Sequence, residues 1–418
     1  MRDSGATGTR ERRSAAPLRE REFRLLFAGR TVSLLGNAIA PVALAFAVLD
    51  LTGSKTDLGL ILAAREIPLV VFLLAGGVWA DRLPRNRVMV GANVVSGLSQ
   101  VTVAALLIVG EAEIWQLAAL AAVNGGASAF YFPASGGAVP QSVPESMLQE
   151  ANALLSLTVN ATQIAGAAVA GFLVAAFGSG IGIAVDAAAY LLAAMILAAM
   201  RLNVAAQAEL RSFLGELATG WREFRSRTWL WAIVLQFALL LAVVVGALSV
   251  LGPVVAENEL GGAKAWGLIL TAQAVGLLVG ALLGLAWRPR RMLLAATLGV
   301  LLWPSTLLAL GGRVSLPLIM AAAFVAGIGL ETFILLWNTT MQQEIPADKL
   351  SRVYSYDALG SFALVPLGLA AAGPVAELIG IRATLFGAAA IAVAVTLPIL
   401  AVHDVRTLER RPLATPNP

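Results

Sequence analysis

Ionisable side chains inside long apolar stretches are the residues of this chain with the clearest chemical use. Glu331 lies in the string GIGLETFILLW, and Arg30 lies in an apolar run that begins near residue 25. A charge at the centre of a membrane helix costs at least about 2.5 to 3.5 kcal/mol, so each such residue is a candidate functional site. Because apolar surroundings disfavour a charged carboxylate, Glu331 is expected to bind and release a proton, with Arg30 as a candidate partner. The alternatives are a packing carboxyl at Glu331 and an interfacial arginine at Arg30.

Arg65 and Glu66 form a second charged group, in the outer half of the next apolar stretch. Neighbouring residues point in different directions on a helix, so these two are not expected to form a simple pair. Their position predicts a gate or an entry site, and Glu66 is a further candidate for proton coupling. Asp186, in a stretch expected to lie at the periphery, is assigned a structural hydrogen bond.

Uncharged polar and aromatic side chains are candidates for lining a greasy pocket. Apolar walls with a few polar groups suit an amphipathic or aromatic ligand, although ordinary helix packing is the alternative for each residue. The candidates are Asn37, Asn124, Phe130, Tyr131, Gln236, Phe237, Phe333 and Trp337.

Twelve apolar stretches must position these residues. The chain is 59% hydrophobic and 13% charged, far from the quarter of charged residues usual in soluble domains. A helix needs about 20 apolar residues to cross the hydrocarbon, which predicts an all-α membrane protein without a sizeable soluble domain. The expected spans are 25–49, 57–80, 88–110, 114–136, 151–177, 181–201, 229–254, 265–287, 292–311, 316–338, 356–379 and 382–402.

Reactive and metal-binding side chains are scarce. The sequence has no Cys, and its single His, His403, follows the last stretch. Disulfides, thiolate nucleophiles and cysteine-ligated metals are therefore excluded, and neither an enzyme nor a cofactor or metal site is expected.

The basic residues set the expected orientation. Of the 29 Lys and Arg residues, 23 lie in segments that are cytoplasmic if the N-terminus is inside. Short cytoplasmic loops retain such residues, so both termini are expected to be cytoplasmic. The expected domains are a disordered N-terminus (1–17), a six-helix bundle (18–202), an amphipathic linker helix along the headgroups (203–227), a second bundle (228–403) and a tail (404–418).

Two loops repeat along the chain. QSVPESMLQEANA, from 141 to 153, resembles QEIPADKLSRVYS, from 343 to 355, with Gln141 and Gln343 separated by 202 residues. Such spacing predicts two pseudo-symmetric six-helix bundles related by an axis along the membrane normal. Gly276, Gly280 and Gly284 recur every four residues in one stretch, which predicts close helix packing there.

The string GGVWADRLPRNR, from 76 to 87, resembles the signature loop of the major facilitator superfamily. Gly77, Asp81, Arg82 and Arg85 match the family spacing, whereas Pro84 and Asn86 depart from it. Residues 129–154 and 251–284 resemble the branch that contains enterobactin exporters and macrolide or multidrug efflux proteins. The resemblance implies the major facilitator fold and transport of a small molecule. The usual Arg motif of helix 4 is absent, since AAVNGG stands there.

The matching loop residues are expected to form a conformational latch. A carboxylate at Asp81 gains roughly 0.3 to 2 kcal/mol at a helix N-terminus, and the helix beginning near Asp357 is the expected partner. Arg85 would hold Asp81 ionised and oriented. A loop kept basic only to set topology is the alternative.

The expected function is secondary efflux of a small amphipathic or lipophilic compound, coupled to protons. No phosphate-cradling loop for ATP is present. The expected partners are the transported compound, protons and membrane lipids but no nucleic acid, and the chain is expected to be a monomer in the bacterial cytoplasmic membrane. The alternatives are an importer or uniporter of a small solute and a non-transporting membrane sensor.

Overall fold

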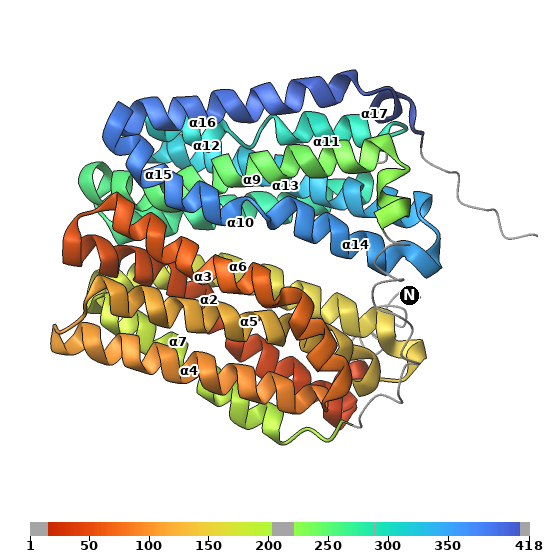
Figure 1. Ribbon diagram of the computed structural model, residues 1–418, viewed down its shortest axis with the longest axis horizontal. Coiled ribbons are helices and arrows are strands. Elements are labelled where there is room, and N and C mark those ends of the chain that lie inside the picture. Colours follow the sequence, from red (N-terminus) through yellow and green to blue (C-terminus); the bar gives the residue numbers. More distant parts are fainter. Residues whose placement is uncertain (1–15, 203–220, 288, 410–418) are drawn as a thin grey trace, which may run out of the picture. The chain divides into compact units, whose positions relative to one another are not determined.

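In the computed structural model, residues 16–202, 221–287 and 289–409 are described, and they are helical over most of their length (Figure 1). The chain divides into two compact units, residues 1–209 with 261–267 and residues 210–260 with 268–418. Within the described residues, eleven segments are long and apolar enough to cross a membrane. The expected span at 57–80 lies within a further helix, Lys55–Arg82. The predicted all-α membrane fold is confirmed.

Six long helices build the N-terminal unit. Among them, α2 packs against α6 and α7, α3 packs against α5, and α4 packs against α5 and α7. A capping box between Glu113 and Gln116 begins α5, and Gly53, with φ 63°, ends α2. The helices are α2 (Arg21–Thr52), α3 (Lys55–Arg82), α4 (Arg85–Val109), α5 (Ile114–Ser142), α6 (Leu148–Phe177) and α7 (Ser179–Ala198).

The C-terminal unit repeats this packing with two spans broken into shorter helices. Here α9 packs against α14, α15 and α16, α11 packs against α13, and α12 packs against α13 and α16. The helices are α9 (Thr228–Val255), α10 (Ala263–Ala286), α11 (Met292–Val300), α12 (Ser305–Gly311), α13 (Leu316–Glu344), α14 (Ala347–Phe362), α15 (Val365–Ile379), α16 (Ile381–Thr396) and α17 (His403–Thr407).

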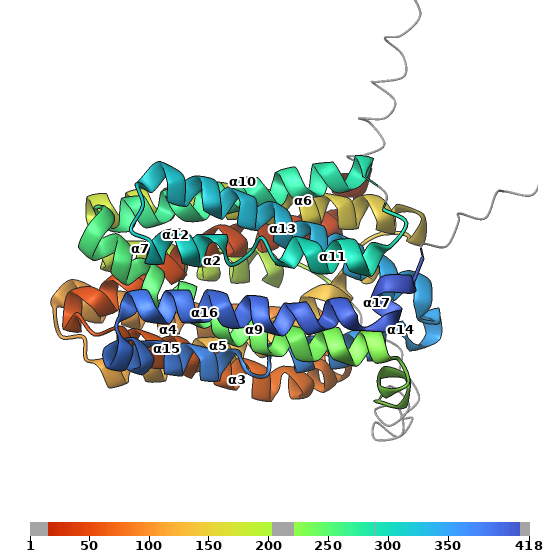
Figure 2. The ribbon, with the colours of Figure 1, turned by 90° about the horizontal axis from the view of Figure 1, so that it is seen from above.

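Prolines lie at both breaks. Pro304 and Pro366 lack the N–H that a continuous helix needs, so the expected spans 292–311 and 356–379 each consist of two helices. Between α11 and α12 the backbone tightens, and the N–H of Trp303 donates to the oxygen of Val300 at 3.0 Å. Figure 2 shows the irregular turn at this point.

Glycines allow direct backbone contact between helices. A side chain on Gly125 of α5 would overlap the backbone oxygen of Arg65 on α3, and one on Gly327 of α13 would overlap that of Gln273 on α10. Gly125 and Gly327 are 202 residues apart, the separation of the repeated loops. Gly166 and Gly368, also 202 apart, both lie in tight helix contacts, Gly166 against the side chain of Ala38 and Gly368 against the backbone of Ala242. The internal repeat therefore extends from the loops into the helix contacts.

The glycines at 276, 280 and 284 lie where close packing is expected. A Cβ on Gly280 would approach the Cβ of Glu331 to 2.9 Å, and Gly276 touches the backbone of Phe324. The predicted close contact of this helix, α10, is confirmed, and its partner is α13.

The expected terminal segments and the linker are only partly described. Residues 16 and 17 begin a short 3₁₀ helix, Ala16–Arg19, with Pro17 buried, and the first residues of the expected tail form α17. The linker at 203–220 lies outside the described residues, as do residues 1–15 and 410–418. Within the described end of the linker, Phe224 is buried against Tyr356 of α14, with ring centroids 6.0 Å apart.

Substitution of Gly125 tests the helix contact. Gly125→Ala is expected to lower the unfolding temperature of the detergent-solubilised protein, since forcing extra atoms into a tight contact costs about 1 to 3 kcal/mol. Gly126→Ala is the matched control, because the nearest side-chain atoms lie 3.9 Å from its Cβ position. Equal melting temperatures for the two variants would contradict the contact.

Candidate functional site

A polar cavity lies inside the N-terminal unit. It has a volume of about 260 Å³ and is walled by α2, α3, α4, α5 and α7. Ten of its lining side chains are polar or charged, which is unusual for the interior of a membrane bundle. The cavity, called here the N-terminal cavity, is lined by Arg30, Ser33, Leu34, Asn37, Arg65, Ala92, Asn93, Ser96, Ser128, Tyr131, Phe132, Ser135, Gly136 and Tyr190.

Arg30 brings an unbalanced positive charge to this cavity. Within the described part of the chain, no carboxylate pairs with its guanidinium. The hydroxyls of Tyr131 and Ser135 lie near each other on the same wall but without the geometry of a hydrogen bond. A buried polar group without a partner costs about 1 to 3 kcal/mol, so the wall retains unused capacity to bind a polar group.

Arg65 and Glu66 form an ion pair, which corrects the sequence interpretation. The Nη1 of Arg65 lies 2.5 Å from the Oε1 of Glu66. The two Cα–Cβ bonds diverge around the helix, but the long arginine side chain curls back to reach its neighbour. The Nε of Arg65 also donates to the Oδ1 of Asn124 at 3.3 Å. These contacts hold Arg65 across the gap between α3 and α5.

Asp186 does not line the cavity, but it links two of the helices that form its walls, α4 and α7. Its Oδ2 accepts a hydrogen bond from the Nε2 of Gln100 at 2.8 Å, which agrees with the structural role expected for it. A Cβ on Gly36 would come within 2.6 Å of its Oδ1, so glycine at this position makes room for the carboxylate. Nearby, Tyr190 donates to the Oδ1 of Asn37. The network fixes α2, α4 and α7 around the cavity.

Several of these residues escaped the sequence analysis. The residues missed were Ser33, Asn93, Ser96, Gln100, Ser128, Ser135 and Tyr190. Asn93, Ser96 and Gln100 repeat at intervals of three and four residues, so they share one face of α4. A polar stripe on a membrane helix predicts a polar interior, so the spacing of Asn93, Ser96 and Gln100 in the sequence could have indicated the cavity.

Aromatic side chains gather inside the C-terminal unit. Phe333 stacks on Phe237 with centroids 4.0 Å apart and on Trp337 at 5.9 Å, and Trp337 meets Trp229 edge-on at 5.5 Å. The indole Nε1 of Trp337 donates to the Oδ2 of Asp357 at 3.2 Å. Three of the predicted pocket residues thus form one row, called here the aromatic row.

Three other predicted pocket residues lie elsewhere. Gln236 is buried, and its Nε2 donates to the Oγ1 of Thr396 at 3.0 Å, a contact between α9 and α16. Phe130 does not line the N-terminal cavity, and its ring lies 6.4 Å from that of Phe72 on α3. Asn124 holds Arg65 and is not among the cavity walls.

Glu331 lies partly buried in α13, facing α10 at Gly280. Within the described residues its carboxylate forms no ion pair. The absence of a side chain at Gly280 leaves room for the Cβ of Glu331 beside the neighbouring helix. This is the only carboxylate of α13 in its apolar portion, since Glu344 ends the helix.

The predicted latch is only partly described. Arg85 donates from Nη1 to the backbone oxygen of Gly137, which has no side chain to obstruct it. Asp357 accepts the hydrogen bond from Trp337. The expectation that a helix begins near Asp357 is wrong, because α14 begins at Ala347 and Asp357 lies well inside it. The surroundings of Gly77 and the side chains of Asp81 and Arg82 are not described.

Comparisons with known proteins agree with this architecture. Residues 26–356 match the family described as the Major Facilitator Superfamily. Multidrug efflux pump Tap of Mycolicibacterium fortuitum is 29% identical over 391 residues, covering 90% of this chain and 92% of that protein. Macrolide efflux protein A of Streptococcus pyogenes is 25% identical over 400 residues, covering 93% of this chain and 97% of that protein.

Solved structures share the fold at low sequence identity. The nucleoside transporter NupG aligns with a TM-score of 0.73 at 13% identity, covering 91% of this chain and 98% of that one. A bacterial homologue of the human lysosomal transporter Spinster, inward-facing and occupied, aligns with a TM-score of 0.71 at 14% identity, covering 93% and 98%. Given the repeated helix packing and a family match over most of its length, this chain is a multi-pass membrane protein of the Major Facilitator Superfamily, a family of transporters rather than enzymes.

Proposed function

We propose that this chain exports small amphipathic or lipophilic compounds by alternating access, in exchange for protons. Export is supported by similarity to a multidrug and a macrolide efflux protein over at least 90% of this chain. Proton coupling is supported chiefly by one observation, a carboxylate in the apolar part of α13 without an ion-pair partner among the described residues. A secondary transporter needs a group that changes charge during its cycle, and Glu331 meets that need.

The N-terminal cavity is the proposed site for the polar part of the cargo. Arg30, Asn37 and Tyr131 bring a charge, an amide and a hydroxyl to one small volume. Arg30 is a candidate for proton coupling, and the hydroxyls of Tyr131 and Ser135, which have no hydrogen-bond partner in the same cavity, favour contact of this wall with cargo as well. Phe237, Phe333 and Trp337 of the aromatic row are buried against one another, so their role in this proposal is to pack the C-terminal unit.

The latch and the membrane placement complete the proposal. Asp81, Arg82 and Arg85, with Gly77, would stabilise the state that is closed to the cytoplasm through the helix that carries Asp357. The chain would lie in the bacterial cytoplasmic membrane as a monomer with both termini cytoplasmic. The proposed bundles are residues 18–202 and 228–403, joined by residues 203–227.

Neutralising Glu331 tests proton coupling. In everted membrane vesicles, Glu331→Gln is expected to abolish uptake of ethidium or a macrolide driven by a pH gradient, because glutamine cannot carry a proton. Exchange of labelled for unlabelled compound without a gradient should persist. Glu377→Gln, at an exposed carboxyl near the end of α15, is the matched control and should keep both activities. Gradient-driven uptake by Glu331→Gln at the wild-type rate would rule out this role.

Removing the charge of Arg30 tests the cargo site. A hydrogen bond to a charged group contributes about 1.5 to 3 kcal/mol, so Arg30→Gln is expected to raise the Kd of a transported compound by about 10- to 100-fold. Arg24→Gln removes an exposed arginine near the start of the same helix and should leave the Kd unchanged. Equal affinities of the two variants, measured by quenching of tryptophan fluorescence, would exclude Arg30 from the site.

Asp81→Asn tests the latch. Transport is expected to fall while the amount of protein in the membrane stays normal, because only the balance between conformations changes. Single-cysteine labelling from the cytoplasmic side should become faster in the variant. Unchanged transport and unchanged labelling would leave the loop with a topological role alone.

A further inference from the structure

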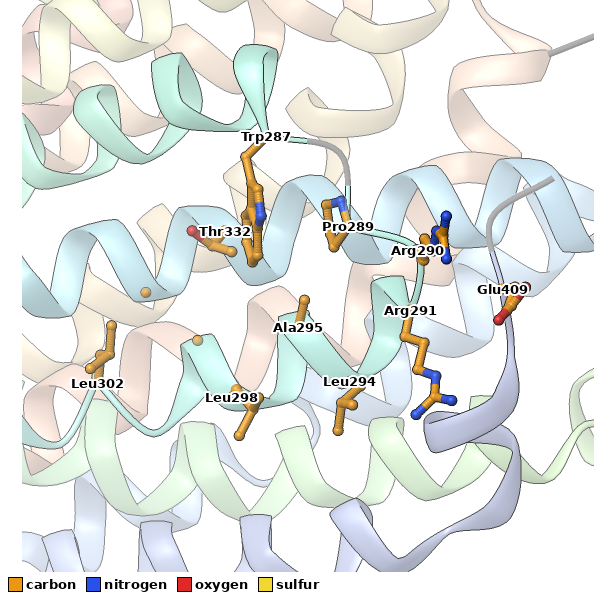
Figure 3. Close-up of a pocket in the computed structure, with 12 residues that line it drawn as sticks. Trp287, Pro289, Arg290, Arg291, Leu294, Ala295, Leu298, Leu302, Thr332 and Glu409 are labelled. Carbon is orange, nitrogen blue, oxygen red and sulfur yellow. The ribbon is translucent and has the colours of Figure 1, made fainter. Parts of the chain in front are cut away.

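A second and larger hollow lies on the C-terminal unit, and Glu331 is not among its lining residues. It has a volume of about 640 Å³ and is lined by Trp287, residues 289–291, parts of α11 and α13, Leu302 and Glu409 (Figure 3). The lining residues, called here the α11 groove, are Trp287, Pro289, Arg290, Arg291, Leu294, Ala295, Leu298, Gly299, Leu302, Gly329, Thr332 and Glu409.

The charged groups of the α11 groove gather at one end. Figure 3 shows Arg290, Arg291 and Glu409 at this end, while Leu298 and Leu302 extend away from it. Both arginines are exposed, and neither forms an ion pair within the described part of the chain. Two arginines against one carboxylate leave a net positive charge, and guanidinium groups bind phosphate through paired hydrogen bonds.

The wall of the α11 groove is apolar. Leu294, Leu298 and Leu302 repeat every four residues, so they share one side of the segment, and Leu298 and Leu302 are 49% and 41% exposed. Eight residues of helix span about 12 Å, close to the half-thickness of a hydrocarbon core about 30 Å deep. A surface of this length and polarity fits one acyl chain of a single leaflet.

Glycines at the contact between α11 and α13 leave the bottom of the groove open. A Cβ on Gly299 would lie 3.0 Å from the backbone oxygen of Gly329, so α11 and α13 touch along their backbones. With Ala295 beside them, no large side chain fills the hollow from below. Trp287, 51% exposed, lies opposite Leu298 in the wall of the groove (Figure 3) and adds apolar surface there.

We propose that the α11 groove binds one anionic phospholipid of the cytoplasmic leaflet, with its phosphate on Arg290 and Arg291 and one acyl chain along Leu294, Leu298 and Leu302. None of these residues belongs to the cavity, the aromatic row or the latch, and the inference rests on the proposed function only for the orientation that places this end of the groove at the cytoplasmic leaflet. A free phosphate ion would satisfy the arginines and leave the leucine wall uncovered. The combination of charge and apolar length therefore favours a lipid.

Native mass spectrometry of the intact protein in detergent tests this site. With equal amounts of phosphatidylglycerol and phosphatidylcholine, the wild type is expected to retain one phosphatidylglycerol, in about tenfold preference or more. The double variant Arg290→Gln with Arg291→Gln should lose this preference. Arg222→Gln with Arg225→Gln removes the same charge from two exposed arginines outside the groove and should keep it.

A second variant separates charge from shape. Ala295→Phe fills the groove without changing charge and should also displace the lipid, and circular dichroism confirms that each variant is folded. Retention of phosphatidylglycerol by both groove variants would overturn the proposal. Displacement of the bound lipid by glycerol phosphate would also overturn it, because it indicates a simple anion site. So would a wild type that is a dimer without bound lipid and that becomes a monomer in the groove variants, because it indicates a second copy of the chain on this face.

Discussion

Backbone contact between helices at glycine is the interaction on which the rest of this structure depends. In hydrocarbon the helices gain little from burying apolar side chains, because lipid is equally apolar, so close packing must hold them together. Gly125 on Arg65 and Gly327 on Gln273 bring α3 to α5 and α10 to α13. The first contact places Arg65 beside Asn124, and the second system of contacts places Glu331 beside Gly280. The positions of Arg65 and Glu331 therefore depend on close contacts between helix backbones.

The two units use the same framework for different interiors. In the N-terminal unit the framework encloses arginines, amides and hydroxyls. The C-terminal unit instead holds a row of aromatic rings, with Asp357 bonded to its Trp337 and Glu331 on the side of α13 that faces α10. A duplicated fold needs equal helix contacts but leaves the inward side chains free to diverge. This division matches the proposed roles, a polar grip on the cargo in one unit and a proton carrier in the other.

Much of the fold was predictable because its determinants are local or periodic. Span length follows from the hydrocarbon thickness, and the repeat was visible in Gln141 and Gln343. The pairing of Arg65 with Glu66 was not predicted, because spacing rules describe Cα–Cβ directions and not the reach of a long side chain. Phe224 is buried by Tyr356, which lies 132 residues further along the chain, and a local sequence pattern does not predict such a distant contact. Of the pocket residues, Asn37 and Tyr131 line the N-terminal cavity, while Phe130 and Gln236 pack between helices.

The central claim is the exchange of an amphipathic compound for protons. Its most direct measurement uses the purified protein in sealed liposomes that hold a pH-sensitive dye, with a pH gradient as the only energy source. Adding a transported macrolide or ethidium should release protons down their gradient while the compound accumulates in the opposite direction. Movement of the compound in the same direction as protons would contradict the proposed exchange. So would accumulation of the compound that does not depend on the pH gradient.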